Sequence, residues 1–112
     1  MWIFSSGSFV SVVADRDNND NLLVRARVAG HIEALFPKAK VFELEDADYR
    51  FRALVAREAA AQVIAKEVES IAYANFKNSV QDPIYHSACR EVWGVMYDLQ
   101  ETGSSSRRYV TA

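Results

Sequence analysis

Apolar and polar side chains alternate along residues 48–55, and this alternation is the clearest pattern in the chain. One set of alternate positions holds Tyr49, Phe51, Ala53 and Val55, and the other set holds Arg50, Arg52 and Leu54. A period of two residues is typical of a β-strand with one buried face and one open face. Residues 22–27 repeat the design, with aliphatic side chains opposed by Arg25 and Arg27. We therefore expect two half-buried strands, each with arginines on its open side.

Two further β-prone runs, residues 2–4 and 9–14, are separated by the sequence Ser5-Ser6-Gly7-Ser8. Small polar residues around one glycine favour a tight turn, so these runs are predicted to form a hairpin. Residues 15–21 are all turn formers or charged, and they lead directly into the strand at 22–27. The first three strands are therefore predicted to form an antiparallel meander.

Three segments show the spacing of helices. Residues 29–36 place apolar side chains at helical intervals and are stopped by a proline. Residues 57–71 carry one apolar stripe and three consecutive alanines, which have a high helix propensity. Residues 84–99 carry the longest apolar face, and Asp82 followed by Pro83 is a typical helix start.

The order of these elements predicts an α+β fold. We expect an antiparallel β-sheet of four to five strands, the fifth at residues 40–45, with two to three helices packed on one face. The 57–71 and 84–99 helices are predicted to cover the sheet. Their common core is expected to contain Val24, Phe51, Ile64, Val68, Val92 and Met96. One domain is expected over residues 1–100, followed by a flexible C-terminal tail at 101–112 that has no core-forming pattern.

The composition restricts the class of protein. Half of the 112 residues are hydrophobic and the formal net charge is −2. These values exclude a largely disordered chain and a globally basic nucleic-acid binder. Cys89 is the only cysteine, which favours a reducing, cytoplasmic setting. No apolar run reaches the roughly 18–20 residues of a membrane span, so we expect no membrane partner.

The candidate binding residues are the four arginines of the two strands: Arg25, Arg27, Arg50 and Arg52. If the strands share a sheet, the guanidinium groups gather on its open face, where they would bind carboxylates or phosphates bidentately. A second interpretation stays open. The same arginines would also suit a solvated face on which they pair with Glu43, Glu45 and the acidic turn before the second strand, and such pairs are weakly stabilising.

Two other patterns resemble sites of chemistry but lack residues that the chemistry requires. Residues 15–20 begin like a calcium-binding EF-hand loop, yet Asp20 replaces the glycine and Ala26 replaces the bidentate glutamate. His86 and Cys89 lie three positions apart and would suit an activated thiol or two metal ligands, but two ligands do not complete a zinc site. The sequence therefore predicts no catalytic residues, no metal and no cofactor.

Five short segments carry a family resemblance: residues 1–4, 22–27, 48–52, 73–78 and 92–97. Together they resemble a group of small uncharacterised bacterial and phage-associated proteins, over about residues 1–100. The resemblance implies a non-enzymatic interaction protein, similar to anti-CRISPR inhibitors, that binds a host protein or ribonucleoprotein complex through a charged surface. It assigns no functional residue.

Two other functions stay open beside this one. The four arginines would suit a small nucleic-acid-binding module, whose affinity would fall steeply with salt. The pair formed by His86 and Cys89 would suit a small enzyme or a metal protein. The sequence does not exclude a homo-oligomer, in which the partner is a second copy of the chain.

Overall fold

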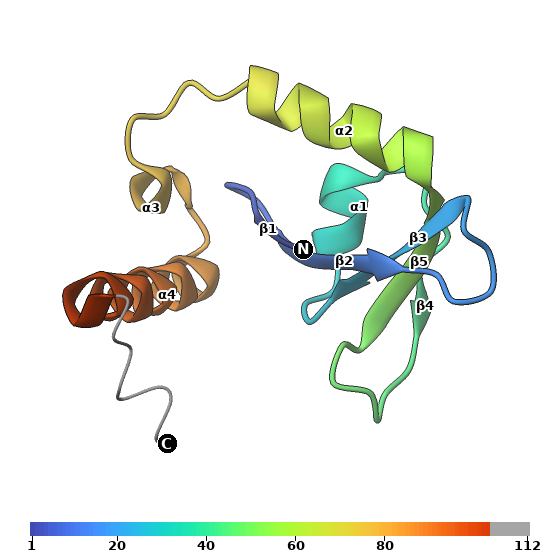
Figure 1. Cartoon of the computed structure of the whole chain (residues 1–112), viewed down its shortest axis with the longest axis horizontal. Coiled ribbons are helices and arrows are strands. Elements are labelled where there is room, and N and C mark those ends of the chain that lie inside the picture. Colours follow the sequence, from blue (N-terminus) through green and yellow to red (C-terminus); the bar gives the residue numbers. More distant parts are fainter. Residues whose placement is uncertain (104–112) are drawn as a thin grey trace. The chain divides into compact units, whose positions relative to one another are not determined.

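Residues 1–103 are described by the structure, a computed structural model, and they form an α+β fold (Figure 1). The chain divides into two units, the first being Met1–Ala74 and the second beginning at Asn75. The single domain predicted over residues 1–100 therefore stays a prediction. Residues 101 and 102, which were assigned to the predicted tail, belong to the last helix, and the tail from residue 104 onward lies outside the described residues.

The Met1–Ala74 unit contains a five-stranded sheet in which every neighbouring pair of strands is antiparallel. Its strands are β1 (Trp2–Phe4), β2 (Phe9–Ala14), β3 (Asn21–Ala26), β4 (Phe42–Glu43) and β5 (Phe51–Ala56). The order across the sheet is β1-β2-β3-β5-β4, so the first three strands form the predicted meander and β5 pairs with β3. The predicted antiparallel sheet is confirmed, including the edge strand within residues 40–45.

β5 begins at Phe51, three residues later than the alternating pattern predicts. The N–H of Leu44 donates to the carbonyl of Arg50 at 2.8 Å, and the N–H of Tyr49 donates to the carboxylate of Asp48 at 2.9 Å. Residues 48–50 therefore belong to the connection between β4 and β5. Side chains alternate between the two faces of a sheet only within a strand, so alternation does not predict the direction of side chains in this connection.

The described residues contain four helices: α1 (His31–Leu35), α2 (Arg57–Glu69), α3 (Phe76–Ser79) and α4 (Pro83–Thr102). Gly30 starts α1 with a φ of 91°, a left-handed conformation that costs glycine little. The carboxylate of Asp82 accepts the N–H of Tyr85 at 2.8 Å, which confirms the predicted N-terminal cap of α4.

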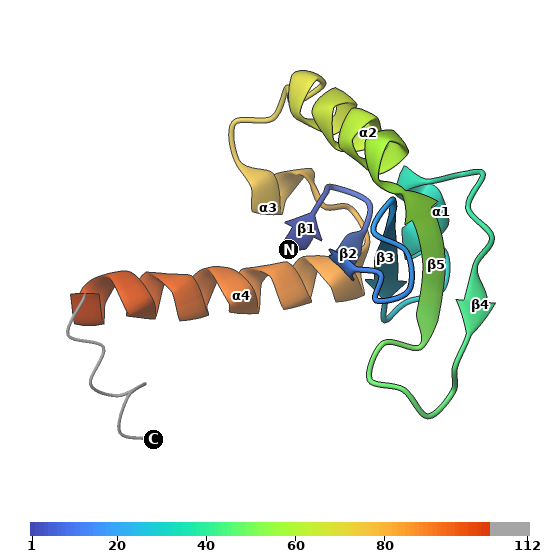
Figure 2. The ribbon, with the colours of Figure 1, turned by 45° about the vertical axis from the view of Figure 1, so that its right-hand side comes forward.

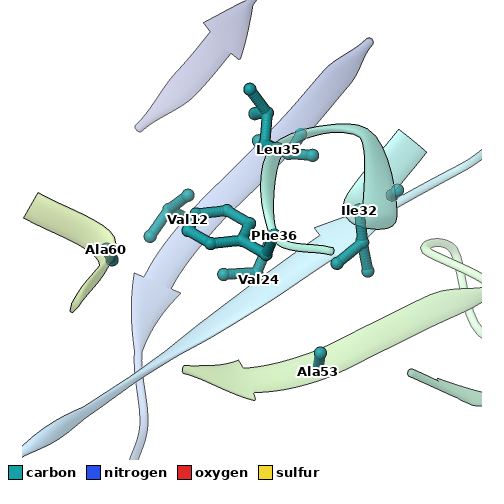
Figure 3. Close-up of a cluster of buried hydrophobic side chains, with 9 residues drawn as sticks. Val12, Val24, Ile32, Leu35, Phe36, Ala53 and Ala60 are labelled. Carbon is teal, nitrogen blue, oxygen red and sulfur yellow. The ribbon is translucent and has the colours of Figure 1, made fainter. Parts of the chain in front are cut away.

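The core of the Met1–Ala74 unit lies between one face of the sheet and α1 (Figure 3). Its buried side chains are Val10, Val12, Val24, Ala26, Ile32, Leu35, Phe36, Ala53 and Ala60. α1 packs against β2, β3 and β5, while α2 packs against β3 and β5. Only the beginning of α2 reaches this cluster, through Ala60 and the half-buried Val63. The face covered by these helices is the core face of the sheet.

The predicted common core is wrong at Val68, which is 62% exposed. Val24 is fully buried, and Phe51 and Ile64 are partly buried. The predicted burial of Val92 and Met96 against the sheet stays a prediction, because both residues belong to the unit that begins at Asn75.

α2 follows β5 without an intervening residue (Figure 2). A hollow of about 400 Å³ lies between its later part and β1, lined on the two sides by Ile64 and Val68 and by Ile3 and Phe4, so this part of the apolar stripe does not reach the core. The short helix α1 covers the middle of the sheet instead.

The unit that begins at Asn75 has little core of its own within the described residues. α3 packs against α4, and the buried apolar side chains of this unit are Val80, Tyr85 and Cys89. Trp93 stacks on Tyr97 with ring centroids 5.4 Å apart, and the Lys77 ammonium lies 4.8 Å from the centre of the Trp93 ring. The predicted packing of the 84–99 helix on the sheet stays a prediction.

Candidate binding face of the sheet

Two rows of side chains cross the sheet on the face opposite the core, which we call the open face. The first row is Ser11, Arg25, Arg52 and Phe42, and the second row is Val13, Leu23 and Leu54. Side chains of directly paired residues project from the same face of a sheet. Val12, Val24 and Ala53 pair with one another and lie in the core, so their chain neighbours project from the open face.

Arg25 and Arg52 are direct partners across β3 and β5. Arg25 Nη2 donates to Ser11 Oγ at 2.8 Å, while Arg25 Nε is buried and has no hydrogen-bond acceptor among the described residues. Arg52 Nε donates to the carbonyl of Tyr49 at 3.1 Å, and its Nη2 lies 3.4 Å from the carboxylate of Asp48. Two like charges therefore face each other, with one carboxylate beside them.

The side chain of Tyr49 packs against two arginines of this face and holds them in position. The phenol ring is 4% exposed, with the guanidinium carbon of Arg25 at 4.4 Å and that of Arg27 at 4.2 Å from its centre. The prediction that Tyr49 shares a side with Phe51 and Ala53 is therefore wrong. Residues 48–50 precede the strand, and the Tyr49 side chain turns toward the open face instead of the core.

Arg27 and Arg50 have other partners, and Arg50 lies away from the open face. Its guanidinium carbon is 5.9 Å from the centre of the Phe51 ring, and Phe51 pairs with the core residue Ala26. Arg27 Nη1 donates to the carbonyl of Asp48 at 2.8 Å. Arg50 forms ion pairs with Glu43 at 2.7 Å and with Glu45 at 3.3 Å, and all three side chains are solvent-exposed. Exposed pairs of this kind contribute at most about 1 kcal/mol. The fold thus gathers Arg25, Arg27 and Arg52 around Tyr49, while Arg50 takes part in the surface pairing that the second interpretation describes.

The open face also carries aromatic residues, which the alternating arginine pattern does not predict. Trp2 and Phe9 meet edge to face with centroids 5.8 Å apart, and Phe4 stacks on Phe9 at 4.5 Å. Trp2 is 65% exposed, Leu54 51% and Phe42 45%. The pairing of a β1–β2 hairpin would have placed Trp2 and Phe4 on one face. The alternation within residues 2–4 was the signal that could have found them.

A hollow of about 530 Å³ lies on the open face. It is lined by Val13, Ala14, Asp15, Arg16, Asp17, Leu23, Arg25, Phe42, Arg52 and Leu54. Both rows of the open face contribute to its floor, and the loop between β2 and β3 supplies the charged residues of its rim. The hollow therefore places the guanidinium groups of Arg25 and Arg52 beside aliphatic side chains, with Arg16 in the charged loop.

The sequence patterns that suggested other chemistry have structural explanations. The carboxylate of Asp15 accepts the N–H of Asp17 at 3.1 Å, and Asn18 Oδ1 accepts the N–H of Asp20 at 2.9 Å, which is ordinary hairpin-loop geometry. Arg57 Nε donates to the carbonyl of Asn19 at 3.0 Å and ties this loop to the start of α2.

His86 and Cys89 do not form an activated thiol. His86 Nδ1 lies 3.1 Å from the carbonyl of Val80. Burial raises the pKa of the Cys89 thiol, and a side-chain hydrogen bond with Tyr85 offsets part of that rise. A raised pKa favours the neutral thiol, which is a poor nucleophile. Within residues 1–103, no three His, Cys, Asp or Glu side chains are grouped so that they could hold a metal ion.

Comparison with protein-family models, with curated proteins and with solved structures finds no match to this chain. Among the helices of residues 1–103, none combines the length and the apolar character that crossing a membrane requires.

Proposed function

We propose that the protein is a non-enzymatic binding protein whose open face contacts a protein partner. The observation that carries the proposal is the composition of this face, where aromatic, aliphatic and arginine side chains surround one hollow. Trp2, Phe42 and Leu54 are about half exposed beside Arg25 and Arg52. Protein–protein interfaces are enriched in aromatic residues and arginine, and Trp, Tyr and Arg dominate their binding energy.

The resemblance to phage-associated proteins suggests the kind of partner. Small inhibitors of that type act by surface contact with a host complex. We therefore propose a host protein, alone or within a ribonucleoprotein complex, as the partner of the open face.

The charges around the hollow give weaker support to nucleic acid as the partner. Arg16 lies on the rim beside Asp15 and Asp17. Arg52 already faces Asp48, and the formal net charge of the chain is −2. Binding to a phosphate backbone depends on a surplus of positive charge. Acidic and basic side chains are nearly balanced here, which suits a protein surface better.

The proposal is tested by affinity capture from a host lysate, in which the wild type is compared with the substitution Leu54→Glu. Exposed substitutions usually change the free energy of unfolding by less than about 0.5 kcal/mol, so the variant should fold. We expect the captured partner to be lost, because a carboxylate would enter the apolar part of the contact surface. Val28→Glu is the matched control, since Val28 is also half exposed and does not line the hollow.

An unchanged set of captured proteins with folded Leu54→Glu would contradict the proposal. Equal losses with Leu54→Glu and Val28→Glu would also contradict it, because the effect would not depend on the open face. Capture that disappears after nuclease treatment would favour the nucleic-acid module instead.

A further inference from the structure

The hollow of the open face joins two kinds of recognition surface. One side of it is cationic, formed by Arg25 and Arg52, and the other side is aliphatic, formed by Val13, Leu23 and Leu54. The two rows lie two residues apart along each strand, which corresponds to about 7 Å. Acidic and apolar side chains of one ligand segment would reach both rows at once.

Arg25 is the member of the arginine pair that has no carboxylate partner among the described residues. Like charges directly opposite each other in a sheet are destabilising. Asp48 is 3.4 Å from Arg52, and Arg25 has only the hydroxyl of Ser11 as a hydrogen-bond acceptor among the described residues. Asp15 and Asp17 line the rim, but neither forms an ion pair with Arg25 or Arg52 within residues 1–103. A bound carboxylate would offset the repulsion between the two guanidinium groups.

The guanidinium group of Arg25 is already held in place before any ligand binds. Arg25 stacks on the buried ring of Tyr49 and bonds to Ser11, which is 1% exposed. Arg52 is fixed by the backbone carbonyl of Tyr49. Side chains that are ordered in advance lose little conformational entropy on binding, so their hydrogen bonds contribute more to affinity.

We infer that this hollow is a carboxylate-binding site that recognises a Glu or Asp side chain flanked by aliphatic side chains on the partner protein. The inference rests on the proposed function and adds the chemistry by which the partner is recognised. A carboxylate accepts short, charge-assisted hydrogen bonds from guanidinium N–H groups. Arg25 Nη2 already donates to Ser11, and Arg52 Nε and Nη2 already face Tyr49 and Asp48, so the Nη1 groups of the two arginines are the ones that would donate to the ligand. The neighbouring aliphatic row selects a carboxylate in an apolar context over a phosphate chain, whose own neighbours are charged and hydrated.

The probe for the test is isovalerate, a carboxylate on a small branched aliphatic body, added to the full chain and followed by two-dimensional NMR. We expect resonances of the Arg25 and Arg52 guanidinium groups and of the Leu54 methyl groups to shift in a saturable way. Isovaleramide, which has the same shape without the charge, should leave them unchanged. Inorganic phosphate and a single-stranded oligothymidylate form two further arms at equal ionic strength.

The substitution Arg52→Met keeps the aliphatic stem and removes the charge. We expect about tenfold weaker isovalerate binding or more, the effect of losing a charge-assisted hydrogen bond. Arg52→Lys keeps the charge but loses the planar guanidinium, which holds its contacts with Tyr49 and Asp48 while it donates to the ligand, so it should bind more weakly than the wild type as well. Arg50→Met is the control, because Arg50 does not line the hollow, and it should retain wild-type binding.

The absence of saturable shifts with isovalerate, or equal binding by folded Arg52→Met, would overturn the inference. Binding of phosphate or oligothymidylate in preference to isovalerate would overturn it in favour of a nucleic-acid partner. The two proposals fail separately. If Leu54→Glu loses the captured partner but the wild type does not bind isovalerate, the open face remains the interface and the carboxylate chemistry is removed. If the wild type binds isovalerate but Leu54→Glu captures the same proteins, the carboxylate site remains and the open face is removed as the interface.

Discussion

At the scale of single residues, Tyr49 determines how the arginines of the open face are arranged. Its buried ring lies against the guanidinium groups of Arg25 and Arg27, and its carbonyl accepts a hydrogen bond from Arg52. Cation–π contacts contribute about 0.5–2 kcal/mol, more when the groups are shielded from water. One aromatic residue thus orders three cations that would otherwise be flexible and mutually repelling.

Cys89 gives a residue-scale prediction about pH. Burial raises the pKa of its thiol above the ordinary value of 9.0, with the hydrogen bond to Tyr85 acting in the opposite direction. A raised pKa in the folded state adds stability that is fully present below the pKa of the unfolded chain. That stability is lost as the pH rises through the folded pKa. We therefore expect Cys89→Ala to reduce the alkaline decrease in the free energy of unfolding, measured by chemical denaturation from neutral to alkaline pH.

Tyrosines and lysines also titrate at alkaline pH, so the comparison with the wild type is what isolates the thiol. Parallel declines of the two proteins above pH 9.0 would contradict the assignment. Rapid alkylation of Cys89 in the native protein at neutral pH would contradict it as well, because a buried neutral thiol reacts slowly.

At the scale of elements, a helix of five residues contributes more to the core than one of thirteen. α1 and the residue that follows it place Ile32, Leu35 and Phe36 in the buried cluster, whereas α2 contributes only Ala60 to its buried members. The difference follows from how each helix is connected. α1 returns over the sheet after the turn at Gly30, while α2 extends directly from the end of β5.

Alanine substitutions in the two helices test this assignment. Ile32→Ala should lower the free energy of unfolding by about 2–5 kcal/mol, because Ile32 is fully buried and its removal leaves a cavity. Ile64→Ala should cost less, below about 2 kcal/mol, since Ile64 is only partly buried and lies outside the buried cluster. Denaturant unfolding of both variants measures the difference. Equal costs would mean that α2 covers the sheet more fully than its contacts indicate.

At the scale of the whole molecule, the Met1–Ala74 unit carries the sheet, its buried cluster and the open face. Its 74 residues exceed the roughly 40 below which a chain usually needs disulfides, metals or a partner to fold. The binding face that we propose thus lies entirely within a unit that has its own core.

A fragment of residues 1–74 is therefore expected to fold by itself. Thermal unfolding followed by circular dichroism should be cooperative, and the amide NMR spectrum should be dispersed. The fragment should also retain isovalerate binding if the hollow works as inferred. A fragment without cooperative unfolding would support the single domain over residues 1–100 that the sequence predicts.

Local patterns in the sequence were sufficient for most of the elements. The strands Trp2–Phe4 and Phe9–Ala14 and the capped start of α4 have the predicted residues. Strand alternation and helix capping depend on residues within a few positions of each other, so the sequence contains the information directly. The alternation placed arginines on one side of each strand, whereas the direct pairing of Arg25 with Arg52 is known only from the structure.

The tertiary structure alone decided which helix covers the sheet, where Tyr49 points and which arginines meet. These features depend on the direction in which the chain leaves a strand, and no periodicity encodes that direction. β5 starts at Phe51 instead of Asp48, so Tyr49 lies between arginines and not in the core. Arg50 pairs with Glu43 and Glu45 for the same reason, because it lies at the junction of a turn and a strand. The sequence identifies the arginines of the two strands, but the turn before β5 determines which of them lie at the same site.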